Sequence, residues 1–140
     1  MSQHLVVLLL GSNLGKIKKN IDKAINLIEN EIGKILDKSQ YLETEPLEYK
    51  SSNNFCNIAV SLNTFLSPLE LLKKLKKIER KMGREKDSAE FGFYSDRIID
   101  IDIIYFNKLT FISKKLNLPH YKHINERDFS KKLISQLKDK

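Results

Sequence analysis

The sequence has 140 residues and is poor in the features that indicate a disulfide scaffold or a membrane protein. Its one cysteine, Cys56, excludes an internal disulfide and any zinc site made of several cysteines. Its longest apolar run, Leu5 to Leu10, is far shorter than the roughly 18 residues that a membrane-spanning helix needs. No basic segment precedes this run, so nothing near the N-terminus is typical of a secretory leader. We therefore expect a cytoplasmic protein whose cysteine is reduced.

Positive charge exceeds negative charge in this chain. Lys and Arg total 25 and Asp and Glu total 18, which gives a formal net charge of +7. Hydrophobic residues make up 41%, enough for a packed core, and the length predicts a single domain over residues 1–140. A basic surface suits an anionic partner, but the net charge does not distinguish nucleic acid, a membrane surface and a small phosphorylated ligand.

Hydrophobic periodicity predicts alternating strands and helices. The predicted strands are residues 5–10, 41–44, 55–65 and 97–106, and the predicted helices are 17–32, 67–82 and a last one from about Asn125. Polar segments at 45–54 and 84–96 are predicted to be long loops, and 118–121 is predicted to be a turn. This order favours an α+β fold, a ferredoxin-like βαββαβ sandwich. It would have an antiparallel sheet, helices packed on it and a short C-terminal helical tail.

Local signals mark the ends of the helices. Ser67 and Glu70 form the pattern of a capping box at the start of the second helix. Gly33 and Gly83 stand where a glycine commonly ends a helix. The same helix carries a run of lysines on one side, which we interpret as a solvated surface.

Asp100 and Asp102 are the residues that most strongly indicate a chemical function in the sequence. In a strand, residues two apart project from the same face, so both carboxylates are expected together while the intervening isoleucines point into the core. Neighbouring carboxylates repel unless a cation neutralises them, and hard oxygen ligands suit Mg²⁺. The alternative is two surface aspartates on a solvated edge strand. Arg84 and Arg97 favour the metal site, because arginines beside carboxylates suit a nucleoside triphosphate with its metal ions.

Three other candidates indicate structure rather than chemistry. The segment Gly11–Gly15 lacks the glycine spacing and the lysine of a phosphate loop, and we interpret it as a structural turn. His4 and His120 are interpreted as isolated, because neither has a partner at metal-ligand spacing. Cys56, in a predicted strand, is interpreted as a buried structural residue.

Several segments, taken in order, resemble a known family. They are Leu10-Gly11-Ser12-Asn13-Leu14-Gly15, Tyr41-Leu42-Glu43-Thr44-Glu45-Pro46-Leu47, Phe55-Cys56-Asn57-Ile58-Ala59-Val60, Leu69-Glu70-Leu71-Leu72, Ile78-Glu79, Gly83-Arg84, Arg97-Ile98-Ile99-Asp100-Ile101-Asp102-Ile103, Pro119-His120 and Glu126-Arg127-Asp128-Phe129. Their order and spacing, from about residue 5 to residue 129, are similar to those of the 6-hydroxymethyl-7,8-dihydropterin pyrophosphokinases of folate biosynthesis.

This resemblance implies a reaction and its cofactors. The β,γ-pyrophosphoryl group of ATP would pass to the hydroxymethyl group of the reduced pterin, releasing AMP. Two Mg²⁺ ions would be held by Asp100 and Asp102, and Arg84 and Arg97 would bind the phosphates as catalytic residues. ATP would be the co-substrate. We expect a monomer that binds these small molecules and neither nucleic acid nor membrane.

The resemblance also implies the residues that contact each substrate. For the pterin they are Thr44, Leu47, Phe55, Asn57 and Phe129, with the Asn57 amide on the ring edge and the two phenylalanines on its faces. For ATP they are Glu79, Arg84, Tyr94, Arg97, Ile103, Lys115, His120, Tyr121 and Arg127. Three of these positions depart from the family pattern, which commonly has tyrosine at 55, tryptophan at 94 and arginine at 115.

Two other functions stay open at this point. The net charge of +7 is compatible with a basic ferredoxin-like module that binds nucleic acid. The departures near Tyr94 are compatible with a catalytically silent pterin or nucleotide binder.

Overall fold

The computed structural model describes residues 2–45, 53–83 and 97–138 of the chain. The strands are β1 (His4–Ser12), β2 (Gly33–Lys38), β3 (Leu42–Thr44), β4 (Phe55–Thr64), β5 (Asp100–Phe106), β6 (Phe111–Ile112) and β7 (Asn117–Leu118). The helices are α1 (Ile17–Glu31), α2 (Pro68–Lys81), the π-helical segment η1 (Lys122–Glu126) and α4 (Asp128–Ser135).

One antiparallel sheet forms the centre of the molecule. Its strand order is β2-β4-β1-β5, and β3 pairs with the N-terminal end of β4 beyond β2. Strand β1 leads through α1 to β2, which lies beyond β4, and β4 leads through α2 to β5, which lies beyond β1, as in two interleaved βαβ units. The predicted ferredoxin-like α+β fold is therefore confirmed.

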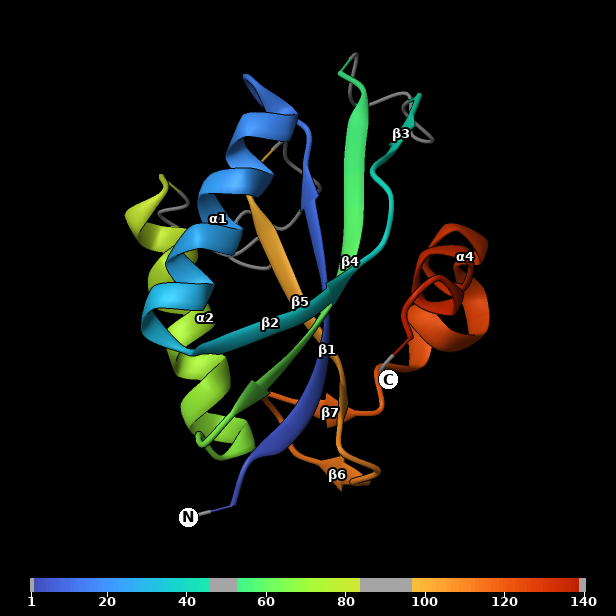
Figure 1. Cartoon of the computed structure of the whole chain (residues 1–140). Coiled ribbons are helices and arrows are strands. Elements are labelled where there is room, and N and C mark those ends of the chain that lie inside the picture. Colours follow the sequence, from blue (N-terminus) through green and yellow to red (C-terminus); the bar gives the residue numbers. More distant parts are fainter. Residues whose placement is uncertain (1, 46–52, 84–96, 139–140) are drawn as a thin grey trace.

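Both long helices cover the same face of this sheet, which we call the helix face (Figure 1). Alternate residues of β1, such as Leu8 and Leu10, are fully buried there against Leu71 and Leu75 of α2. Each such side chain contributes about 1.5–3 kcal/mol by leaving water. The predicted capping box is confirmed: Ser67 Oγ accepts from the Glu70 N–H, and the Glu70 carboxylate accepts from the Ser67 N–H.

The opposite face of the sheet, which we call the carboxylate face, carries α4 (Figure 1). Val7 and Leu9 of β1 pack here against Leu133 and Ile134 of α4. The predicted tail helix thus exists, but it begins at Asp128 rather than near Asn125. The preceding residues form η1 instead, which brings His123 over β5 next to His120.

Two details of the second strand were predicted wrongly. Gly33 is not a helix cap. It pairs with Thr64 as the first residue of β2, and a Cβ there would lie 1.8 Å from the Asn63 carbonyl oxygen. Only a glycine allows that approach. The strand predicted at 41–44 is the shorter β3, whereas β2 at 33–38 was missed because its apolar pair Ile35 and Leu36 does not alternate with its charged residues.

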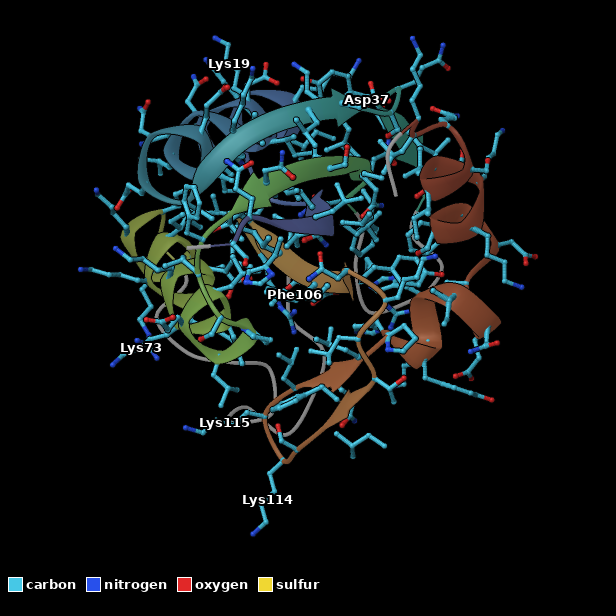
Figure 2. All side chains as sticks on the ribbon, turned by 60° about the horizontal axis from the view of Figure 1, so that its bottom comes forward. Lys19, Asp37, Lys73, Phe106, Lys114 and Lys115 are labelled. Atoms are coloured by element: carbon cyan, nitrogen blue, oxygen red, sulfur yellow. The ribbon has the colours of Figure 1, made fainter. Side chains whose placement is uncertain are left out.

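The basic side chains of the helices and of the last hairpin point into solvent. Lys19 of α1 and Lys73 of α2 extend outward, as do Lys114 and Lys115 of the turn between β6 and β7 (Figure 2). The predicted solvated lysine surface is confirmed, whereas the turn predicted at 118–121 begins with β7. In the described part of the chain, no helix combines the length and apolar character needed to cross a membrane.

Candidate active site

Strand β5 places the two aspartates on the carboxylate face. Ile99, Ile101 and Ile103 are buried in the core on the helix face, so the strand alternation turns Asp100 and Asp102 the other way. Their side chains are 33% and 30% exposed. The predicted common orientation of the two carboxylates is therefore confirmed, and both remain accessible to a ligand.

A row of paired residues connects the carboxylate of Asp100 with the amide of Asn57. Asp100 lies opposite Gly11 on β1, and Gly11 lies opposite Asn57 on β4. Neighbours in such a row share a face, and two strand spacings separate the outer pair by about 10 Å. Gly11 therefore lies in a strand rather than in the predicted turn. A Cβ there would come within 2.6 Å of Asn57 Oδ1, so glycine leaves room for that amide.

Arg97 reaches the same face from the segment just before β5. Its Nη1 lies 3.3 Å from Oδ1 of Asp100. Its backbone is fixed by Asn13, whose side-chain Oδ1 accepts from the Arg97 N–H at 2.8 Å and whose own N–H donates to the Arg97 carbonyl at 3.1 Å. Asn13 is buried, and the sequence interpretation assigned it no role. Asn13, which follows β1, is thus joined to the arginine three residues before β5.

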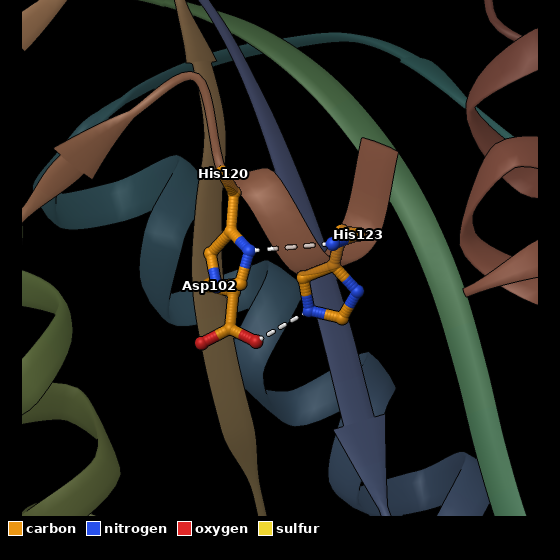
Figure 3. Close-up of side chains that lie close together, drawn as sticks. All are labelled: Asp102, His120 and His123. Atoms are coloured by element: carbon orange, nitrogen blue, oxygen red, sulfur yellow. Dashed lines mark hydrogen bonds and ion pairs between the residues drawn. The ribbon is translucent and has the colours of Figure 1, made fainter. Parts of the chain in front are cut away.

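Asp102 has a histidine partner that the sequence interpretation missed. Nε2 of His123 lies 2.7 Å from Oδ2 of Asp102 (Figure 3). Nδ1 of the same ring lies 2.6 Å from Oγ of Ser130. Burial raises the pKa of the Asp102 carboxyl, but the hydrogen bond and positive charge of His123, with His120 and Arg127 behind it, hold that pKa below its usual value. Asp102 is thus ionised at neutral pH.

His120 is not isolated, which corrects the interpretation from sequence. Its ring centroid lies 4.4 Å from that of His123, and its backbone N–H donates to the Ile104 carbonyl of β5 at 3.0 Å. Burial lowers the pKa of His120, and the nearby Asp102 offsets this only in part. The error arose because the partners are Asp102, distant in sequence, and His123, whose position depends on the π-helical turn.

Two further predicted residues lie around the His123 ring. Nη1 of Arg127 is 3.1 Å from Nε2 of His123, and the ring of Phe129 meets the His123 ring edge-on at 6.2 Å. At the other end of the carboxylate face, Thr44 of β3 pairs with Phe55 of β4. Phe55 is two residues from Asn57 in β4, so the two residues lie on the same face. The predicted stacking of a ring between Phe55 and Phe129 stays a prediction.

The remaining predicted ATP residues lie in different surroundings. Glu79 is buried on α2, where its Oε2 accepts from the Ile101 N–H at 2.7 Å and its Oε1 lies 3.7 Å from Nζ of Lys76. Ile103 points into the core, so only its backbone could contact a ligand. Lys115 and Tyr121 are exposed. Leu47, Arg84 and Tyr94 lie outside the described residues.

A cavity of about 620 Å³ lies elsewhere, at the C-terminal end of β5 beneath η1 and α4. Tyr105, Lys108, Ile124 and Lys131 are among the residues that line it, and it includes none of the predicted site residues. Of the predicted site residues that the structure describes, Asn57, Asp100 and Asp102 lie on the carboxylate face of the sheet instead.

Comparisons with known proteins identify the family of the chain. The family model of 7,8-dihydro-6-hydroxymethylpterin-pyrophosphokinase (HPPK) matches residues 7–139. The chain belongs to the HPPK family. It is 36% identical over 134 residues to the 2-amino-4-hydroxy-6-hydroxymethyldihydropteridine pyrophosphokinase of Porphyromonas gingivalis, covering 95% of this chain and 90% of that protein.

HPPK relatives also occur as parts of longer proteins. The chain is 40% identical over 124 residues to the folate synthesis bifunctional protein of Arabidopsis thaliana, which covers 89% of this chain but only 25% of that protein. Among solved structures, the wild-type HPPK-DHPS of Plasmodium falciparum with pteroate has a TM-score of 0.68 at 20% identity, over 92% of this chain and 37% of that one. This last similarity bears on the fold alone.

Proposed function

We propose that this chain transfers the pyrophosphoryl group of ATP to 6-hydroxymethyl-7,8-dihydropterin, giving the pterin diphosphate and AMP in folate biosynthesis. Membership of the HPPK family and the names of its relatives support this reaction. The observation that carries it is the position of the Asp100 and Asp102 carboxylates on the sheet face that also carries Asn57. We also propose that the chain is monomeric and is located in the cytoplasm.

The two aspartates fit a pair of Mg²⁺ ions, which they would hold together with the phosphates of ATP. Both present ionisable oxygens on one face, about 7 Å apart along the strand, and both are partly open to solvent. When bound, Mg²⁺ would neutralise the phosphates and lower the pKa of the attacking hydroxyl group. The lowered pKa of Asp102 keeps its carboxylate charged and able to serve as a ligand at neutral pH.

The chain's own residues would then align the two substrates. Arg97, which now contacts Asp100, is placed to exchange that contact for a phosphate oxygen, and Arg84 is proposed to bind the phosphates as well. Arg127 and His120 lie around Asp102 and are proposed to contact the nucleotide. Reactions of this type need alignment and charge neutralisation more than covalent chemistry. The other proposed ATP contacts are Glu79, Tyr94, the Ile103 backbone, Lys115 and Tyr121.

The pterin is proposed to lie over the other end of the row that joins Asp100 to Asn57. The Asn57 side chain can both donate and accept, which suits the amide-like edge of a pterin. Phe55 and Phe129 would stack on the ring, and Thr44 and Leu47 would offer backbone groups. Gly11, between Asp100 and Asn57, leaves the sheet flat where the ring would lie.

An assay of AMP release tests this function. We expect AMP only when both the hydroxymethyl pterin and Mg·ATP are present, in equal amount to the pterin diphosphate. A folded chain that forms no AMP in the presence of both substrates would contradict the proposal. AMP formation without pterin would indicate a different reaction of ATP.

A further inference from the structure

We propose that Asp102, His120 and His123 form a binding site for a borderline divalent transition-metal ion such as Zn²⁺ or Co²⁺. The three side chains converge from β5 and from residues 120–123 (Figure 3). One ligand atom from each lies within 4.8 Å of the others. Metal-to-ligand distances of about 2.0–2.2 Å bring tetrahedral ligand atoms to about 3.3 Å from one another, so small side-chain rotations complete the site.

The ligand set differs in kind from the oxygen ligands proposed for Mg²⁺. Imidazole nitrogens favour zinc, cobalt, nickel and copper, whereas carboxylates and water favour magnesium. Along β5, Asp100 faces the guanidinium of Arg97 at 3.3 Å, while Asp102 faces an imidazole at 2.7 Å. Asp102, which is proposed to hold Mg²⁺ when ATP is bound, therefore also has an imidazole partner that suits a transition-metal ion when ATP is absent.

Ser130 supports His123 as a ligand in the way that outer residues commonly support metal-bound histidines. Its Oγ lies 2.6 Å from Nδ1 of His123, and both residues are buried. In the metal-free chain Nε2 donates to Asp102, and a metal ion would replace that proton. A hydrogen bond from Nδ1–H to Ser130 Oγ would then fix the ring form whose Nε2 lone pair binds the ion. Asp102 and His120 are both partly exposed, so an ion has access from solvent and can keep water in its remaining positions.

Arg127 opposes a cation at this position. Its Nη1 lies 3.1 Å from Nε2 of His123, where the metal would bind. Its long side chain is only half buried, so it can move away when an ion enters. Two kinds of substitution should therefore change metal affinity in opposite directions. Removing the guanidinium in Arg127→Gln should tighten metal binding, whereas removing a ligand should weaken it.

Titration of the untagged 140-residue chain with Co²⁺, without ATP or pterin, tests the proposal. Visible absorbance bands should appear with one equivalent of Co²⁺, and Zn²⁺ should displace them. We expect His123→Met and His120→Asn each to lower Co²⁺ affinity by at least about tenfold, and Arg127→Gln to raise it. The chain has three histidines, so His4→Asn is the matched control and should leave affinity unchanged.

Zn²⁺ binding followed by NMR of the histidine rings gives a second readout in the unmodified protein. The resonances of His120 and His123 should shift, while those of His4 should not. Equal shifts of all three rings, or Co²⁺ affinity unaltered in folded His120→Asn, would overturn the proposal. The outcome is distinct from that of the AMP assay, because either metal binding or pterin-dependent AMP release can fail while the other is observed.

Discussion

The two faces of the sheet are built by different rules. On the helix face, buried side chains come from regular positions of β1, β4, β5, α1 and α2, and almost all of them are aliphatic. On the carboxylate face, Asp100, Asp102, Asn57 and Gly11 come from three strands, and His123 comes from a π-helical turn. The first face follows the periodicity of the sequence, whereas the second depends on which strands lie side by side. The comparison predicts that substitutions on the helix face change stability and substitutions on the carboxylate face change activity.

The largest effect is expected from Asp102→Asn. Loss of the charge removes a proposed metal ligand, and a metal ion supplies several kcal/mol of transition-state stabilisation, so turnover should fall by at least about 100-fold. The asparagine Oδ1 can still accept from His123, so the midpoint of urea unfolding should change little. The exposed Glu29→Gln on α1 is a control of equal charge change. Near-normal turnover in Asp102→Asn would remove Asp102 from the metal site.

Leu75→Ala tests the helix face. Leu75 is 1% exposed in the centre of α2, and truncation there should lower the free energy of unfolding by about 2–5 kcal/mol. The folded fraction should keep its normal turnover. Leu69→Ala is a control on the same helix, because Leu69 is 48% exposed and its loss should change stability by less than about 0.5 kcal/mol. Urea unfolding of both variants measures the difference, and equal effects would contradict the assignment of this face.

Gly11→Ala tests the link between the two central strands. The new methyl group would meet Asn57 Oδ1 at 2.6 Å and displace the amide, so the KM for the pterin should rise by about tenfold, as expected for one lost hydrogen bond. If the effect passes through Asn57, the double variant with Asn57→Ala should be no worse than Asn57→Ala alone. Additive losses in steady-state kinetics would show that Gly11 acts in another way.

Ser67→Ala is expected to have the smallest effect, a loss of about 1 kcal/mol from the cap of α2. The backbone hydrogen bond from Ser67 holds the pKa of Glu70 below its usual value, so this part of the cap is present at neutral pH. It should be lost as the pH falls below about 4.3 through the folded-state pKa. Ser67→Ala keeps this backbone N–H, so unfolding at neutral and acidic pH should show that both chains lose stability in acid, while the difference between them changes little.

Regular elements could be predicted wherever burial and secondary structure share a period. The apolar spacing of α1 and α2 and the alternation around Asp100 gave the correct helices and the correct face for both carboxylates. Irregular elements could not. Gly33 lies in β2, where its backbone passes too close to the Asn63 carbonyl for any side chain. The segment η1 is π-helical, and no simple hydrophobic pattern indicates that geometry.

The sequence by itself determined the α+β order, the helix face and the aspartate pair, because each depends on residues that are close along the chain. Only the tertiary structure decided that Asn57, Gly11 and Asp100 form one row and that His123 meets Asp102. Those contacts join positions far apart in sequence, and their geometry follows from strand register and from the packing of α4 on the carboxylate face. Local sequence motifs therefore supply the residues proposed for chemistry, and the pairing of strands in the sheet brings those residues together into one site.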